Sequence, residues 1–236
     1  STATVSLALR DSPLVAEATK QRVKAYANEI GYIYNRRAAS LRTSKSGIIG
    51  VVVHDIMNPF YAEILRAIET ELDRSGQTFL LSNHYDSVEK QRAFLETLMQ
   101  LGADGVIMSP AIDTPTSDIE LGIRNGLPFV FIARSVEGAD IPVFRGDDAF
   151  GVGLATNHLV SLGHRRIAMI GGSDKTSTGR DRFRGYREAM EKAGLAMRPE
   201  WRIPGPRTKA AGFEAASQFL ALRDRPTAAV CWNDLV

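Results

Sequence analysis

The sequence predicts an α/β fold with doubly wound parallel sheets, and three observations support this. An unbroken apolar run, Ile48–Val53, has the length and composition of a strand covered on both faces. From there to the end of the chain, short apolar runs alternate with amphipathic helical patterns. A long interval between Ala133 and Ile167 holds a helical pattern that could connect two such units. We therefore expect two α/β lobes with a cleft between them.

The chain opens with two helical patterns that precede this core. Val5 and Leu9 share one helical face, and Asp11-Ser12-Pro13 ends the pattern. A second helix is predicted over Ala16–Ile30, with Gly31 as its stop. The stripe predicted for its buried face comprises Thr19, Val23, Tyr26, Ala27 and Ile30.

Capping and turn residues bound the elements that follow. Asn58-Pro59 predicts the start of a helix that ends at Gly76, and Asp86-Ser87-Val88-Glu89 predicts a capping box for the next helix, through Leu101. The other predicted helices are Ser117–Asn125, Phe150–Leu162, Asp181–Ala193 and Thr208–Leu222. The predicted strands are Ile48–Val53, Thr78–Ser82, Gly105–Met108, Phe129–Ile132, Val143–Phe144, Arg166–Ile170 and Ala228–Cys231.

Composition excludes several classes of protein. The 236 residues are 44% apolar and 24% charged, which is ordinary for a globular protein with a substantial core. No apolar stretch is long enough for a membrane helix, and residues 1–15 do not read as a signal peptide. The single cysteine, Cys231, excludes an internal disulfide framework, and we expect it to be a buried small side chain at a strand end.

The charge is unevenly distributed. Residues 1–46 carry eight Lys and Arg against three Asp and Glu, whereas the remaining residues carry 21 against 24. Lys20 and Lys24 lie four residues apart on the second predicted helix, where they could meet phosphates. A basic head on a slightly acidic body is typical of a nucleic-acid binder, although a charge run alone is more often a solvated surface.

The segment Asn35–Ser46 joins the head to the core. It is short, cationic and weakly helical, with one large apolar residue, Leu41. Helices of this length are marginal in water without packing partners. We predict a hinge whose order depends on what it contacts.

Several motifs give a specific resemblance. Thr2-Ala3-Thr4-Val5-Ser6, Thr19-x-x-Arg22-Val23, Glu29-Ile30-Gly31-Tyr32, Asn35 and Ala38-x-Ser40-Leu41-Arg42 resemble the headpiece of the lactose/galactose repressor (LacI/GalR) family. The resemblance continues through Ile49-Gly50-Val51-Val52-Val53, Asn58-Pro59-Phe60, Gly163-His164-Arg165-Arg166-Ile167 and Arg182-x-x-Gly185-Tyr186. It implies a helix-turn-helix reader, a hinge helix and a ligand-sensing core.

The resemblance also implies boundaries. A DNA-binding headpiece would span residues 1–46, with a hinge helix at about 36–43. The ligand-binding core would span 47–236 as two Rossmann-like lobes of the periplasmic-binding-protein type I fold, divided at about residue 160. The first helix of the helix-turn-helix and the end of the second lobe would then be missing from this chain.

The same resemblance assigns DNA-contacting residues. Thr2, Ala3 and Leu7 correspond to positions that read bases, and Ser6 lies on the same polar face. Leu7 departs from the polar residue often found there, and either meets a thymine methyl or packs. Thr19 either donates to phosphate or caps its helix. In the hinge, Leu41 would wedge between minor-groove base steps beside Arg42, with Ala38 in close contact and Asn35 at the hinge start; alternatively, Leu41 packs the hinge on the core.

Ligand-contacting residues are also implied, at the carboxyl ends of the predicted strands, where open α/β sheets bind ligands. Aromatic faces suit sugar C–H groups, and carboxylate, guanidinium and amide groups pair with hydroxyls. Arg182 could instead form an ion pair between lobes, and Phe60 could belong to the core. Arg207 replaces a frequent aromatic residue and hints at an anionic ligand. The implied set is Phe60, Tyr61, Asp148, Arg182, Arg207 and Asn233.

No catalytic motif was found, and the four histidines lack the spacing of a zinc site, so neither an enzyme nor a cofactor is predicted. We predict a bacterial, cytoplasmic DNA-binding transcriptional regulator, a repressor, with operator DNA and a small polar effector such as a sugar as partners. It would be a homodimer, with a tetramer as the alternative. The second reading is a two-lobed sugar-binding transport protein without DNA binding, which would need an export signal and no basic head. An α/β enzyme ranks third.

Overall fold

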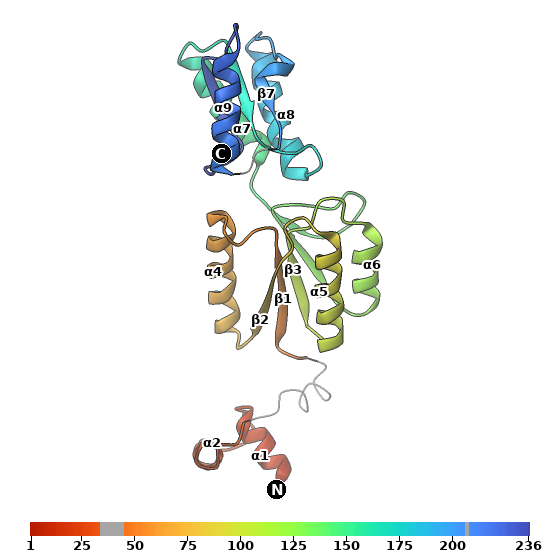
Figure 1. Ribbon diagram of the computed structural model, residues 1–236. Helices are drawn as coiled ribbons and strands as arrows, with labels where there is room; N and C mark the ends of the chain where they lie inside the picture. Colours follow the sequence, from red (N-terminus) through yellow and green to blue (C-terminus); the bar gives the residue numbers. More distant parts are fainter. Residues whose placement is uncertain (34–44, 206–207) are drawn as a thin grey trace. The chain divides into compact units, whose positions relative to one another are not determined.

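The structure is a computed structural model that describes residues 1–33, 45–205 and 208–236 (Figure 1). Its internal contacts divide the chain into two units, Ser1–Ser46 and Gly47–Val236, which we describe separately. Some predictions lie outside the described residues: the hinge helix and the roles of Asn35, Ala38, Leu41, Arg42 and Arg207.

The first unit contains two helices, α1 (Thr2–Leu9) and α2 (Glu17–Glu29). Ser1 caps α1 by accepting a hydrogen bond from the Thr4 N–H, and Gly31 follows α2 with φ +65°. The predicted stripe of α2 is only partly right, because Tyr26 and Ile30 are exposed and Ala27 is its one buried residue.

Two lysines of this unit are already paired. Lys20 lies 3.3 Å from a Glu17 carboxylate oxygen, and Lys24 lies 2.5 Å from Asp11. Both pairs are solvent-exposed on at least one side, so they contribute little to stability. They leave these lysines available to exchange an acidic partner for another anion.

The second unit begins with a five-stranded parallel sheet in the order β2-β1-β3-β4-β5. The predicted strands are confirmed, with β2 one residue longer than expected. Their bounds are β1 (Ile48–Val53), β2 (Thr78–Asn83), β3 (Gly105–Met108), β4 (Phe129–Ile132) and β5 (Val143–Phe144).

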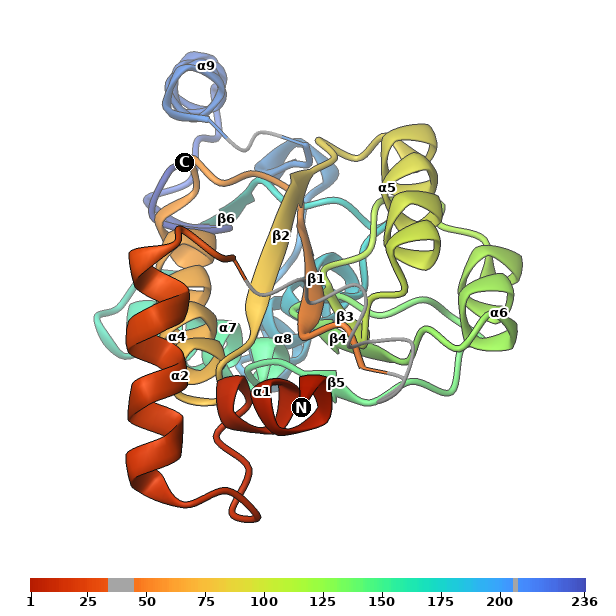
Figure 2. The same ribbon diagram turned by 90° about the horizontal axis from the view of Figure 1, so that it is seen from below.

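Helices cover both faces of this sheet, as the unbroken apolar run of β1 requires. Helix α4 (Pro59–Arg74) packs on the face that carries Val51 and Val53, whereas α5 (Val88–Leu101) and α6 (Thr116–Arg124) pack on the face that carries Val52. Figure 2 shows the same layers from below. Asn58 caps α4 with Pro59 as its first residue, as predicted.

A second parallel sheet has the order β7-β6-β8 and its own core. Helices α7 and α8 pack on one face, around Ile167 and Met190, and α9 packs on the other around Ala168 and Phe219. The elements are α7 (Asp148–Ser161), β6 (Ile167–Ile170), α8 (Ser177–Lys192), a 3-10 turn η1 (Pro199–Trp201), β7 (Arg202–Ile203), α9 (Lys209–Ala221) and β8 (Ala228–Cys231).

The packing of α7 moves the division between the lobes. Val152, Leu159 and Val160 of α7 pack against the core of the second sheet. The two sheets therefore separate between β5 and α7, earlier in the chain than the boundary near residue 160 expected from the sequence. The connecting segment is a short stretch after Phe144, not a helix.

Four local predictions are corrected. The N-cap of α5 is Ser87, whose hydroxyl accepts from the Lys90 N–H, so the predicted capping box from Asp86 to Glu89 does not form. Helix α8 starts at Ser177, four residues earlier than predicted, with Thr176 as its cap. The short strand β7 was not predicted. Cys231 is exposed rather than buried, although partial burial still raises the pKa of its thiol.

None of the helices in residues 1–33, 45–205 and 208–236 has both the length and the apolar composition to span a membrane.

Candidate functional site

A row of polar residues lies at the carboxyl ends of the first sheet's strands. His54 directly follows β1, His84 directly follows β2, and Arg134 comes two residues after β4. Strands β1 and β2 are parallel, with Val53 opposite Asn83, so the histidines that follow them become neighbours. This edge is where open α/β sheets bind ligands.

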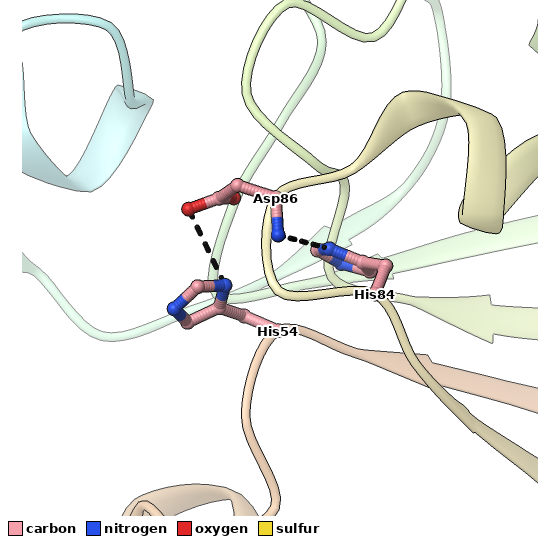
Figure 3. Close-up of side chains that lie close together, drawn as sticks. All are labelled: His54, His84 and Asp86. Carbon is pink, nitrogen blue, oxygen red and sulfur yellow. Dashed lines mark hydrogen bonds and ion pairs between the residues drawn. The ribbon is translucent and has the colours of Figure 1, made fainter.

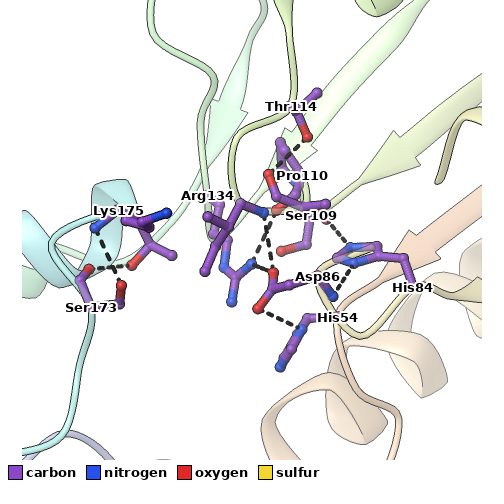
Figure 4. A network of polar contacts seen from close by, with 12 residues as sticks. His54, His84, Asp86, Ser109, Pro110, Thr114, Arg134, Ser173 and Lys175 are labelled. Atoms are coloured by element: carbon purple, nitrogen blue, oxygen red, sulfur yellow. Dashed lines mark hydrogen bonds and ion pairs between the residues drawn. The ribbon is translucent and has the colours of Figure 1, made fainter. Parts of the chain in front are cut away.

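One carboxylate, that of Asp86, connects these strand ends (Figure 3). Its Oδ1 accepts a hydrogen bond from Nη1 of Arg134 at 2.5 Å, and its Oδ2 lies 3.3 Å from Nδ1 of His54. The Asp86 backbone N–H donates to Nδ1 of His84 at 2.9 Å, and Nε2 of His84 donates to the Ser109 carbonyl at 2.8 Å. Figure 4 shows the same network with Pro110, whose carbonyl accepts from Arg134 at 3.1 Å.

Asp86 stays ionised in this setting. Burial alone would raise the pKa of Asp86, but hydrogen bonding to His54 and the charge of Arg134 outweigh burial and hold that pKa well below its usual range. The Asp86 and Arg134 side chains are 12% and 8% exposed, so the pair is largely shielded from water. We call Asp86 and its partners His54, His84 and Arg134 the Asp86 network.

The backbone around the Asp86 network is unusual. Tyr85, Asp86 and Ala133 have backbone φ angles of 48°, 63° and 60°. These angles lie in the left-handed region, which residues other than glycine rarely adopt. Such residues persist only where the surroundings hold them, and they tend to gather at functional sites.

His84 makes the folded state sensitive to acid. It is 0% exposed, and burial, partly offset by its hydrogen bond to Ser109, lowers its pKa from 6.5 to about 4. Because the unfolded chain binds a proton there first, stability is present above pH 6.5 and is lost as pH falls towards 4. We expect the free energy of unfolding to drop by about 2 kcal/mol between pH 7.5 and 5 from this residue.

Urea unfolding at the two pH values measures this loss. His84→Gln keeps an N–H donor for Ser109 but does not titrate, and it should remove most of the pH dependence. His158→Gln changes an exposed histidine of α7 and should leave the dependence as it is. An equal pH dependence in the His84 variant would contradict the assignment.

The second sheet contributes a different set of groups. Arg182 of α8 donates from Nε to Oδ1 of Asp148 at 2.7 Å and from Nη1 to the Trp232 carbonyl at 2.5 Å. Its guanidinium lies 4.4 Å from the Trp232 ring centroid. Asp148 is the first residue of α7, where a carboxylate is favoured by the helix dipole. These contacts fix the guanidinium plane.

His54 and Arg134 of the Asp86 network and the groups around Arg182 line one cavity of about 600 Å³ within the second unit. Its volume suits a small molecule. From the first lobe it is lined by His54, Asp55, Asn58, Phe60, Tyr61 and Arg134, from the segment after β5 by Arg145 and Asp147, and from the second lobe by Asp148, Thr178, Arg182, Trp232 and Asn233, among others.

The predicted ligand residues that the structure describes all reach this cavity, in different ways. Phe60 is 51% exposed and offers a ring face. Tyr61 is only 5% exposed, with its hydroxyl 2.8 Å from Ser109 Oγ, so most of its ring belongs to the core. Asn233 uses its Oδ1 to accept from the Leu235 N–H at 3.0 Å, which leaves its NH₂ group as a donor.

The predicted DNA-reading residues lie on the helices of the first unit. Thr2 and Ala3 are exposed near the start of α1, where a recognition helix meets base edges. Ser6 and Leu7 of α1 and Thr19 of α2 are half-buried. Leu7 therefore has part of its side chain packed within the unit.

Sequence reasoning missed the Asp86 network and Trp232. The sequence alone predicts only a helix-capping role for Asp86, and it shows the histidines only as dispersed side chains. A signal was present, because His54 and His84 each directly follow a predicted strand. The sequence does not show, however, that those two strands are neighbours in the sheet.

This cluster is unsuited to hold a metal ion. Potential ligand atoms of His54, His84 and Asp86 do lie within 4.8 Å of one another. Both ring nitrogens of His84 are hydrogen-bonded, however, and Asp86 is paired with Arg134. A metal would have to break those contacts in a buried place.

Comparison with protein families gives two matches that divide the chain. Residues 1–35 match the model of bacterial regulatory proteins of the lacI family. Residues 46–236 match the model of periplasmic binding proteins and the sugar-binding domain of the LacI family. The predicted resemblance and fold class are confirmed, and the head argues against a transport protein without DNA binding.

Individual relatives agree. The transcriptional repressor PurR of Photobacterium profundum is 33% identical over 237 residues, covering all of this chain and 71% of that protein. The maltose regulon regulatory protein MalI of Escherichia coli is 31% identical, covering all of this chain and 69% of that protein. These relatives are transcriptional regulators and not enzymes, in agreement with the prediction from the sequence.

Solved structures show the same architecture. The CelR–cellobiose complex, a transcriptional regulator, aligns with a TM-score of 0.69 and 27% identity, covering 98% of this chain and 70% of that one. The regulator CcpA of Lactococcus lactis aligns with a TM-score of 0.71 and 25% identity, covering 80% and 68%. With both parts of the chain matched, it belongs to the LacI family of DNA-binding transcriptional regulators, whose core is a periplasmic-binding-protein-like sugar-binding domain.

Proposed function

We propose that the cavity at the strand ends of the two sheets is the effector site of this regulator. The observation that carries the proposal is the convergence of aromatic, amide, carboxylate and guanidinium groups from both sheets on one space of about 600 Å³. Phe60, Tyr61, Asp148, Arg182 and Asn233 would contact the effector, as would Arg207, which lies outside the described residues.

The charges around the cavity favour an uncharged polyol, such as a sugar, over an anion. Each lining guanidinium is paired: Arg134 with Asp86, Arg182 with Asp148, and Arg145 with Asp181 at 2.7 Å. Within the described chain, the lining carboxylates of Asp55, Asp147 and Asp234 have no cationic partner. Among the described lining residues, a phosphate would meet these carboxylates without a free cation, which is unfavourable.

Control of DNA binding would follow from differential affinity. An effector that contacts both lobes favours the lobe arrangement in which all its contacts form. Its effect on operator affinity is limited to the difference in its affinity for the two arrangements.

Operator reading is assigned to the first unit and the segment after it. Thr2, Ala3, Ser6 and Leu7 on α1 would meet base edges, and Thr19 would meet a phosphate. The exposure of Thr2 and Ala3 supports this. Outside the described residues, Leu41 and Arg42 would enter the minor groove, with Asn35 and Ala38 beside them.

Assembly as a homodimer in the bacterial cytoplasm fits this role. Helix α9 exposes Phe213 by 76% and Leu220 by 68%, two large apolar side chains on a surface helix. Covering both side chains in a contact with a second copy would remove apolar surface from water. A symmetric dimer would present two heads to a two-fold operator.

A thermal-shift panel tests the effector proposal. Maltose, D-ribose, cellobiose, fructose 1-phosphate, a sugar acid and a purine base would each be added to the protein. A ligand at 100 times its Kd should raise the free energy of unfolding by about 2.7 kcal/mol. We expect the uncharged sugars to give the larger shift; operator binding with and without the hit then gives the sign of regulation. Stabilisation by the phosphate alone, or by none of the compounds, would contradict the proposal.

A further inference from the structure

Two histidines of the Asp86 network are held in opposite tautomers. Nδ1 of His54 is buried, lies 3.3 Å from Oδ2 of the ionised Asp86 and has no other hydrogen-bond partner in the described chain. Because a carboxylate only accepts, we place the hydrogen of His54 on Nδ1. At His84 the Asp86 backbone N–H donates to Nδ1, so the hydrogen is on Nε2, which donates to Ser109. The Asp86 carboxylate thus sets the tautomer of His54, and the Asp86 backbone N–H sets the tautomer of His84.

His54 differs from His84 in where its second nitrogen lies. Both nitrogens of His84 are used inside the protein, and the residue is 0% exposed. The His54 side chain is 15% exposed and lines the cavity. Figure 3 shows its Nε2 on the side of the ring away from Asp86 and His84. With Nδ1–H fixed, a neutral His54 offers Nε2 to the cavity as an acceptor.

The charged groups near His54 define what changes when it takes a proton. Asp86 lies against Nδ1, Arg134 shares that carboxylate, and the His84 ring centroid is 5.9 Å away. Asp55 is the next residue. The segment after β5 adds Arg145 and Asp147 to the same cavity, and the second lobe adds Asp148, Arg182 and Asp234. Protonation places a second cation beside Arg134 and turns Nε2 from an acceptor into a donor.

We propose that His54 is a specificity-determining residue of the effector cavity. Its Nε2, held as an acceptor by the contact of Nδ1–H with Asp86, receives a hydrogen bond from an effector hydroxyl. Protonation removes that acceptor, so effector affinity depends on pH. This inference rests on the proposed function, because it assigns a contact within the same site.

The expected size of the effect follows from one hydrogen bond. A ligand hydroxyl that loses its acceptor in a closed site is left unpaired. Affinity for an uncharged sugar should therefore fall about tenfold when His54 takes up a proton. The direction separates His54 from a purely structural histidine, which would change stability without a matching change in affinity.

The first measurement needs no effector. Long-range ¹H–¹⁵N NMR of the protein above pH 7.5 reports which ring nitrogen carries the hydrogen. We expect Nδ1–H at His54 and Nε2–H at His84. In Asp86→Ala the His54 ring should lose its single tautomer, because the acceptor that fixes it is gone. A wild-type His54 with its hydrogen on Nε2 would overturn the proposal whatever the ligand.

The second measurement uses the sugar among maltose, D-ribose and cellobiose that stabilises the protein most. Its Kd is measured by calorimetry across the pH range of the His54 titration seen by NMR. His54→Asn keeps an N–H towards Asp86 and lacks the cavity-facing nitrogen, so its Kd should be about tenfold weaker near neutral pH and flat with pH. His158→Asn, on the exposed side of α7, should behave as wild type.

The outcomes separate this inference from the function on which it rests. Binding that weakens with protonation in wild type and stays flat in His54→Asn supports the proposal. A pH-independent Kd in wild type overturns it and leaves the effector site intact. Failure of all three sugars to bind overturns the assignment of His54 as a contact for a sugar hydroxyl, and failure of the whole thermal-shift panel contradicts the proposed function as well.

Discussion

Gly185→Ala is expected to lower the free energy of unfolding by at least about 3 kcal/mol. Gly185 lies in α8, where α8 crosses α7. A Cβ there would lie 2.0 Å from the Ala149 carbonyl oxygen and 2.8 Å from its carbon. These are backbone atoms of α7, so relief would require one helix to move as a body. Chemical denaturation followed by circular dichroism measures the change.

Gly153→Ala is the matched control, from the partner helix of the same contact. Its Cβ would come no closer than 3.6 Å to the Gly185 carbonyl oxygen, an ordinary contact. Alanine is the better helix former, so this change should be neutral or stabilising by up to about 1 kcal/mol. Similar losses for both variants would mean that the helices do not meet at the described separation.

Arg182→Ala is expected to weaken effector binding at least about 100-fold. The change removes a guanidinium that the structure holds on three sides, by Asp148, the Trp232 carbonyl and the Trp232 ring. It also leaves Asp148, 11% exposed, without its cationic partner, and an unpaired carboxylate in a largely buried position is unfavourable. Calorimetry with the strongest sugar of the panel gives the ratio of Kd values.

Arg184→Ala supplies the comparison within the same helix. Arg184 is 51% exposed and pairs with Asp181 one turn earlier, so it contributes little to stability and does not line the effector cavity. Its Kd should match wild type within about twofold. An Arg182 variant that binds as well as this control would exclude Arg182 as an effector contact.

The strands were predictable because their signal is local. A strand buried on both faces reads as a continuous apolar run, as in Ile48–Val53 and Phe129–Ile132, and the structure places both as predicted. Strand β7, Arg202–Ile203, carries no such run, and only its pairing with β6 makes it a strand. Tertiary pairing is the part that local composition does not contain.

The site was predictable to the extent that it follows helix and strand ends. Arg182, Asp148, Phe60 and Asn233 all line the cavity, and the family resemblance had pointed to them. Asp86 was missed because its role comes from contacts with His54 and Arg134, 32 and 48 positions away along the chain. Contacts between side chains so far apart along the chain leave no periodic pattern.

The residues with left-handed backbone angles at the Asp86 network imply a compromise between the stability of the fold and the precision of effector binding. Tyr85, Asp86 and Ala133 each hold a conformation that costs on the order of 1–3 kcal/mol. Glycine at Tyr85 or Ala133 would relax the turns and loosen the groups they aim at the cavity. Selection for thermal endurance and selection for a well-defined effector site therefore act in opposite directions on these turns.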